Sequence, residues 1–123
     1  MSYVNDSVTP VPSDARDAYV ASAKQAWALL AEYGALEISE NWGDKVPSGQ
    51  HTDFLRAVDL RDDETIVFSW VRWPDRDTAE RCEAAMQNDH RFGALPMPFD
   101  GTRMIYGGFT NLFTARADDT PPR

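Results

Sequence analysis

The stretch Thr65–Trp73, which reads TIVFSWVRW, is the most apolar segment of the chain. Apolar residues stand at both odd and even positions, so a strand built from it would bury both of its faces. Pro74 ends the stretch, and Asp75 stands where a helix N-cap belongs. The sequence therefore predicts a central, two-sided strand over 65–73 and a helix over 76–88.

A second helical pattern precedes this strand. Apolar residues recur at spacings of three and four from Tyr19 to Tyr33, which indicates one apolar face of a helix. Ser13 is the expected N-cap, and Gly34 is the expected C-terminal stop. We therefore expect a helix over roughly 14–33.

The remaining strands are predicted from alternation of apolar and polar residues and from turn signals. Pro10 and Pro12 are expected to end the first strand, and a proline-containing loop over 89–102 is expected to precede the last one. Gly107 and Gly108 within the last strand indicate a bulge or a close backbone approach. These predicted strands cover residues 2–8, 35–42, 52–58 and 103–113.

The order strand, helix, three strands, helix, strand predicts an α+β fold. We expect a ferredoxin-like antiparallel sheet with an extra strand and two helices on one face. The opposite face would expose large apolar side chains, and such a patch indicates a partner. Residues 1–114 are expected to form a single domain, and residues 115–123 have the composition of a disordered tail.

The overall charge limits the kinds of partner. The chain carries 12 Lys and Arg against 20 Asp and Glu, a formal net charge of −8, and its basic residues are not clustered. This argues against binding to nucleic acid, because phosphate binding needs clustered cations. No apolar run approaches the ~20 residues that cross a bilayer, and the N-terminus lacks the pattern of a secretory signal. Because Cys82 is also the single cysteine, we expect a cytoplasmic protein without an internal disulfide.

Four motifs follow one another between residues 3 and 113. They are Glu40-x-Trp42-Gly43-Asp44-x-Val46-Pro47, Thr52-Asp53-Phe54-x-Arg56-Ala57-Val58, Val67-Phe68-Ser69-Trp70 and Met97 to Phe109. Together they resemble the YbaA-like bacterial proteins, a family of unknown function. The resemblance implies membership of the dimeric α+β barrel superfamily, in which two ferredoxin-like sheets pack face to face, and it therefore implies a homodimer. That superfamily includes cofactor-independent oxygenases, haem-degrading enzymes and small-molecule-binding proteins, but fold alone transfers none of these activities.

One pair of charged residues is a candidate site. If strands 35–42 and 52–58 form a hairpin, Glu40 faces Arg56 within an apolar stripe. Such a pair can orient a polar ligand. It can also be a structural ion pair at a dimer seam or on an open surface, and structural ion pairs are commoner than sites.

Aromatic residues at strand spacing are a second candidate. Trp42, Trp70, Trp73 and Tyr106 can line a flat pocket, although such residues are more often core or interface. Arg103 can bind an anion or anchor a turn. The predicted ligand-binding residues are therefore Glu40, Trp42, Arg56, Trp70, Arg103 and Tyr106.

No metal or cofactor is expected. His51 and His90 lie in separate loops and have no Cys or acid at ligand spacing, whereas a metal site needs convergent ligands. The sequence also lacks a glycine-rich phosphate loop and a serine nucleophile motif.

The sequence leaves three functions open. The first is a homodimer that binds a small molecule between its sheet and its partner. The second is a cofactor-independent, oxygenase-like enzyme that acts on a small aromatic substrate. The third is a structural dimer without a ligand.

Overall fold

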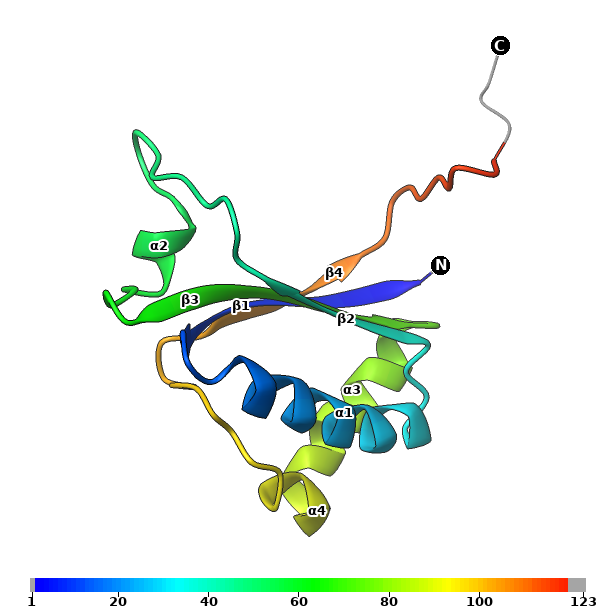
Figure 1. The fold of residues 1–123 in the computed structure, drawn as a ribbon. Coiled ribbons are helices and arrows are strands. Elements are labelled where there is room, and N and C mark those ends of the chain that lie inside the picture. Colours follow the sequence, from blue (N-terminus) through cyan, green and yellow to red (C-terminus); the bar gives the residue numbers. More distant parts are fainter. Residues whose placement is uncertain (1, 120–123) are drawn as a thin grey trace.

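The computed structural model describes residues 2–119, so the last four residues of the expected 115–123 tail lie outside the described part. Its four strands form one antiparallel sheet in the order β2-β3-β1-β4. Helices α1, α3 and α4 lie on one side of the sheet, while α2 and its connections rise from the other (Figure 1). The α+β, ferredoxin-like class is therefore confirmed. The elements are β1 (Tyr3–Pro12), α1 (Arg16–Glu32), β2 (Glu37–Trp42), α2 (Phe54–Ala57), β3 (Glu64–Trp73), α3 (Arg76–Asn88), α4 (His90–Gly93) and β4 (Ile105–Thr110).

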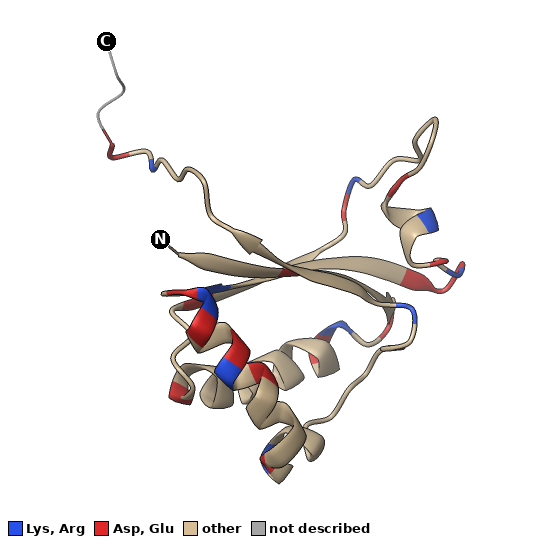
Figure 2. Cartoon of the chain, turned by 180° about the vertical axis from the view of Figure 1, so that it is seen from behind, with Lys and Arg blue, Asp and Glu red and all other residues tan. Residues whose placement is uncertain are grey.

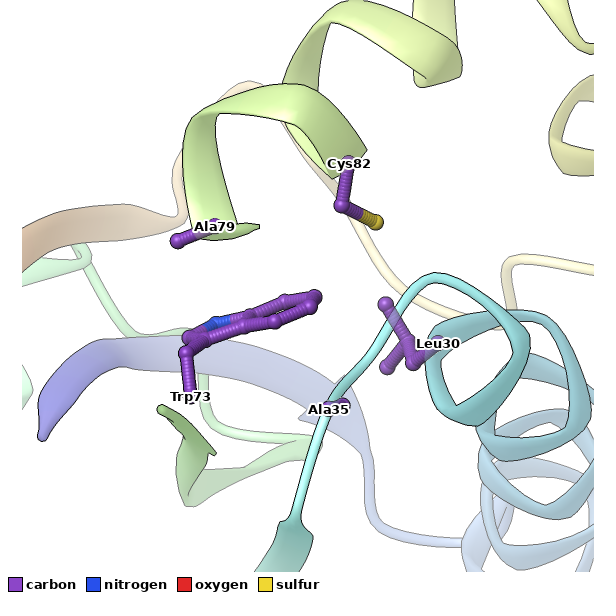
Figure 3. Packing of buried hydrophobic residues seen from close by; sticks show 5 residues of the cluster. All are labelled: Leu30, Ala35, Trp73, Ala79 and Cys82. Carbon is purple, nitrogen blue, oxygen red and sulfur yellow. The ribbon is translucent and has the colours of Figure 1, made fainter. Parts of the chain in front are cut away.

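Strand β3 is an interior strand, as its sequence predicts. It pairs with β1 from Tyr3↔Trp73 to Pro12↔Glu64 and with β2 along its other edge. Its odd-numbered residues face the helices, and Figure 3 shows the Trp73 ring lying between α3 and the end of α1. Burial of this ring stabilises the packing of α1 and α3 on the same face of the sheet. The cluster consists of Leu30, Ala35, Trp73, Ala79 and Cys82.

Strand β1 is longer than expected, because it continues through Pro10 and Pro12. From the sequence, the prolines are expected to end this strand, because proline has no N–H group to donate to a neighbouring strand. In the structure, the pairing of β1 with β4 ends at Val8↔Ile105. Both prolines therefore lie where one edge of β1 has no neighbouring strand, and neither removes a β1–β4 hydrogen bond.

The extra strand predicted over 52–58 is wrong. Residues Phe54–Ala57 form the short helix α2, which Asp53 caps by accepting hydrogen bonds from the backbone N–H groups of Gly49 and Arg56 at 3.0 and 2.7 Å. The alternation of Phe54, Arg56 and Val58 spans too few residues to outweigh this local cap. The sheet consequently has four strands.

The other boundaries shift by small amounts. Helix α1 begins at Arg16, because Ser13 bonds the Thr65 hydroxyl at 2.9 Å instead of capping the helix. Asp75 caps α3 as predicted, accepting from the Thr78 N–H at 2.8 Å. The last strand is shorter than 103–113, and the short helix α4 lies in the expected loop.

The side of the sheet opposite α1 and α3 is called the open face. One end of it is covered, because Val8 and Ile66 pack against Val58, Leu55 and Leu60 from the α2 region. Directly paired residues point to the same face of a sheet. The strand registers therefore identify the side chains that lie on the uncovered part of this face. The open face comprises Val4, Asp6, Glu37, Ser39, Asn41, Phe68, Trp70, Arg72, Ile105 and Phe109.

Candidate functional site

Glu40 and Arg56 do not face each other, so the predicted hairpin pair is wrong. Strand β2 pairs with β3, which places Glu40 opposite Ser69 on the helix-covered side. Arg56 lies on α2, on the other side of the sheet, where it donates to the Gly49 carbonyl at 3.0 Å and contacts Asp53 at 3.4 Å. The two residues therefore belong to different surfaces.

The carboxylate of Glu40 instead accepts hydrogen bonds from two buried hydroxyl groups. Its Oε2 accepts hydrogen bonds from the Tyr19 hydroxyl at 2.7 Å and from the Ser69 hydroxyl at 2.5 Å. Tyr19 and Ser69 are buried, whereas Glu40 is exposed at the edge strand. Burial raises the pKa of Tyr19, and the nearby Glu40 carboxylate raises it further. Tyr19 therefore remains a neutral donor, and it holds the carboxylate in one position.

A hollow of about 370 Å³ opens beside this carboxylate, between α1 and the edge strand β2. Trp42 offers a flat ring there, and the guanidinium of Arg16 lies 5.9 Å from the centre of that ring. The site thus combines an anion, a cation and an aromatic surface, which suits a flat ligand with polar substituents. The hollow is lined by Arg16, Tyr19, Val20, Glu40, Asn41, Trp42 and Val67.

The other predicted site residues do not join this hollow. Trp70 lies on the open face, paired with Asp6. Tyr106 lies on the edge strand β4, opposite Ser7, with 78% of its surface exposed. Arg103 contacts Glu64 and Asp100. The structure therefore brings together Glu40 and Trp42 and separates them from Arg56, Trp70, Arg103 and Tyr106.

Sequence reasoning missed Tyr19 and Ser69 as partners of Glu40. The sequence places Tyr19 in a predicted helix and Ser69 in a predicted strand. Only the packing of α1 on the sheet brings their hydroxyl groups together at Glu40. It also missed Asp6, whose carboxylate lies on the open face between Trp70 and Gly107. Burial raises the pKa of Asp6. The available signal was that Asp6 is the single charged residue of β1.

Within residues 2–119, no three His, Cys, Asp or Glu side chains lie close enough together to hold a metal ion. None of the helices in that range is both long and apolar enough to cross a membrane.

Solved structures with a similar fold include an enzyme and a dimer. A mutant of SnoaB, a cofactor-independent oxygenase from Streptomyces nogalater, matches with a TM-score of 0.57 and 17% identity, covering 92% of this chain and 95% of SnoaB. A dimeric ferredoxin-like protein from an uncultured marine organism matches with a TM-score of 0.51 and 12% identity, covering 95% of this chain and 100% of that protein. At these identities the likeness concerns the fold alone.

Sequence comparison finds much closer relatives. The uncharacterized protein YbaA of Escherichia coli strain K12 is 44% identical over 115 residues, which cover 91% of this chain and 97% of YbaA. The family model described as "Protein of unknown function (DUF1428)" matches residues 2–101. The four motifs between Glu40 and Phe109 are thus confirmed as a family resemblance. The chain belongs to this family of proteins of unknown function.

Proposed function

We propose that this protein is a homodimer that pairs through its open faces, and that each protomer binds a small phenolic compound in the hollow beside Glu40. The observation that carries the ligand proposal is the Glu40 carboxylate, whose Oε2 is held by Tyr19 and Ser69 at the mouth of the hollow. The proposed ligand site therefore lies between the sheet and α1 rather than between the sheet and a partner.

The chemistry of the hollow defines the ligand class. Among the hydrogen bonds within residues 2–119, Oε1 of Glu40 has no protein donor, so it can accept one from a ligand hydroxyl. Trp42 can stack against an aromatic ring, and Arg16 can face a carbonyl or carboxylate substituent. A phenol with an acidic or carbonyl substituent satisfies all three groups at once.

The open face supports the homodimer. Phe68, Ile105 and Phe109 are 39%, 45% and 55% exposed in one protomer, and they lie around the half-buried Trp70. A second copy of the same face would remove these side chains from water. The similar fold of a dimeric ferredoxin-like protein is in line with this arrangement.

Tryptophan fluorescence tests the ligand proposal with 4-hydroxybenzoate as the probe. We expect the compound to change the emission of the protein, and Trp42→Phe to remove that change. Glu40→Gln is expected to weaken binding by about tenfold, or 1.4 kcal/mol. Benzoate, which lacks the hydroxyl group, is expected to bind no better to the native protein than to Glu40→Gln.

Glu37→Gln is the matched control, because Glu37 lies on the same strand but points to the other face and contacts Arg72 at 3.2 Å. It is expected to leave binding unchanged. Equal weakening by Glu37→Gln and Glu40→Gln would contradict the proposed position. No response to any substituted phenol would favour the structural dimer without a ligand.

A second candidate function is an oxygen-using enzyme acting on the same phenol. The observation that favours it is again Glu40, because a carboxylate beside the bound hydroxyl can take its proton and leave the more electron-rich phenolate. The fold similarity to SnoaB fits this candidate. Oxygen uptake on adding a bound phenol, lost in Glu40→Gln, would support the enzyme. Binding without oxygen uptake would support the binding protein.

Sedimentation equilibrium tests the homodimer independently of the ligand. At low micromolar concentration, we expect twice the chain mass of 13.8 kDa. A monomer under these conditions would contradict the dimer and leave the ligand proposal standing.

A further inference from the structure

The segment after β4 is an extended arm with unusual exposure of apolar side chains. The arm is defined as residues Asn111–Thr114. Leu112 and Phe113 within it are 90% and 82% exposed. The arm starts from an anchored position, since the Asn111 N–H donates to the Ser2 carbonyl at 3.1 Å, and the Asn111 side chain donates to the Thr114 hydroxyl at 2.9 Å. Two large side chains are thus presented to solvent from a fixed point.

The arm continues the apolar surface of the open face. Residues 104–114 contain no charged side chain. Figure 2 shows charged residues along the helices and connections, whereas β4 and the beginning of the arm carry none. Ile105 and Phe109 on β4 lead into Leu112 and Phe113, and all four are exposed. A continuous uncharged strip of this kind favours burial against protein.

A groove for these side chains lies at the other end of the open face. It is a hollow of about 210 Å³, smaller than the ~300–1,000 Å³ of typical ligand pockets and better matched to side chains. Phe54 from α2 forms one wall and packs edge-on against Phe68 at 6.3 Å between ring centres. The groove is lined by Asn41, Trp42, Gly43, Asp44, Lys45, Val46, Phe54, Ile66 and Phe68.

The arm does not reach the groove of its own chain. The arm follows the Tyr3↔Thr110 end of the sheet, while Phe68 pairs with Val8 five residues further along β1, about 17 Å away. In Figure 1 the arm also leads away from the sheet, on the same side as α2 but at the opposite end. An arm that docks into this groove would therefore belong to another molecule.

We infer that in the homodimer the arm of each copy docks into the α2 groove of the other copy. This inference rests on the proposed homodimer. If two open faces meet about a two-fold axis that runs along the strands, one α2 opposes the other and the arms oppose each other. If the axis runs across the strands, each arm lies at the end of the sheet that carries the partner α2 (Figure 1). Only the second arrangement brings the exposed side chains of each arm to the end of the partner's open face where the groove lies.

Disulfide cross-linking between two separately purified variants tests the docking. Phe113→Cys mixed with Phe54→Cys is expected to form a disulfide-linked heterodimer under mild oxidation. The native Cys82 does not compete, because it is buried and burial raises its pKa to about 11. Phe113→Cys mixed with Met86→Cys is the matched control, since Met86 is 45% exposed on α3, on the helix side of the sheet. The control pair is expected to remain unlinked.

The dimer dissociation constant provides a second readout. The double variant Leu112→Ser/Phe113→Ser is expected to raise it by at least about tenfold, whereas Met86→Ser leaves it unchanged. A dimer that persists without the 54–113 cross-link, or that links mainly through two Phe113→Cys chains, would overturn arm docking while leaving the homodimer intact. A wild-type monomer in sedimentation would overturn both.

Discussion

Arg103 and Glu64 form a two-pronged ion pair that ties the segment before β4 to the start of β3. Their Nη1–Oε1 and Nη2–Oε2 distances are 2.7 and 2.5 Å, and their side chains are 13% and 7% exposed. Arg103 also donates to the Asp59 carbonyl at 2.9 Å and to the Asp100 carboxylate at 2.8 Å. This guanidinium therefore joins three segments of the chain.

Replacing Arg103 tests the stabilising role of this ion pair. Arg103→Ala leaves the Glu64 carboxylate without its cation in a largely enclosed place, so the midpoint of urea unfolding is expected to fall clearly. Arg76→Ala is the control, because the Arg76–Glu80 pair is well exposed on α3 and contributes little. Equal midpoints for the two variants would contradict a stabilising role of Arg103.

A side chain at position 108 is expected to disturb the packing of β1 on β4. A Cβ atom added to Gly108 would overlap the hydroxyl group and ring of Tyr3. Gly108→Ala therefore has to displace Tyr3 from the edge of the core, at a cost of about 1–3 kcal/mol in the free energy of unfolding. Gly93→Ala, with no atom within 4 Å of the added Cβ, is the matched control. Chemical denaturation of both variants measures the difference.

The stability of the protein is expected to depend on pH below 4. Hydrogen bonds from Arg103 and Thr102 lower the pKa of Asp100 from its ordinary value of 3.8 to about 2. A lowered folded-state pKa gives stability that is present above pH 4 and is lost as the pH falls toward 2. The midpoint of urea unfolding should therefore fall across this range.

Asp100→Asn is expected to flatten that part of the profile. Asp62→Asn, at an exposed position in the connection before β3, is the control for the loss of a carboxylate elsewhere. Identical slopes for all three proteins would show that Asp100 does not contribute. Glu64 acts in the same direction, because Arg103 also lowers its pKa.

Asp6 gives a prediction about assembly. Within residues 2–119, its carboxylate has no side-chain hydrogen bond or ion pair, and burial raises its pKa. Closing the proposed dimer removes more water from this charge, so Asp6→Asn is expected to lower the dimer dissociation constant by roughly three- to tenfold. Sedimentation over a concentration series measures this. A weaker dimer would mean that Asp6 meets a donor or cation in the second copy.

The sequence correctly predicts those elements for which the apolar pattern and the residues at the ends indicate the same structure. In 65–73 both faces are apolar, and Pro74 and Asp75 mark its end, so β3 and α3 were placed correctly. In 52–58 two signals conflict, because the alternation indicates a strand while Asp53 can cap a helix. The Asp53 side chain satisfies the N–H groups of Gly49 and Arg56 locally, whereas a strand could satisfy such groups only with a neighbouring strand.

The candidate site was predicted less well for a different reason. Glu40 and Trp42 alternate along one strand, so their common face follows from the sequence. Their partners Tyr19 and Ser69 are 21 and 29 residues from Glu40, and their proximity depends on how α1 lies across the sheet. Periodicity describes one element at a time and carries no such information.

The position of β1 in the sheet has a consequence for how the chain folds. This strand lies between β3 and β4, and its pair Tyr3↔Thr110 joins residues 107 positions apart in the sequence. During synthesis, the interior of the sheet therefore stays incomplete until residues 105–110 have left the ribosome. Long-range pairing of this kind slows folding, because a large loop must close before its contacts form. Until then, the edge of β1 that β4 will cover presents unpaired backbone groups, and a chaperone or a neighbouring nascent chain would encounter the protein first at that edge.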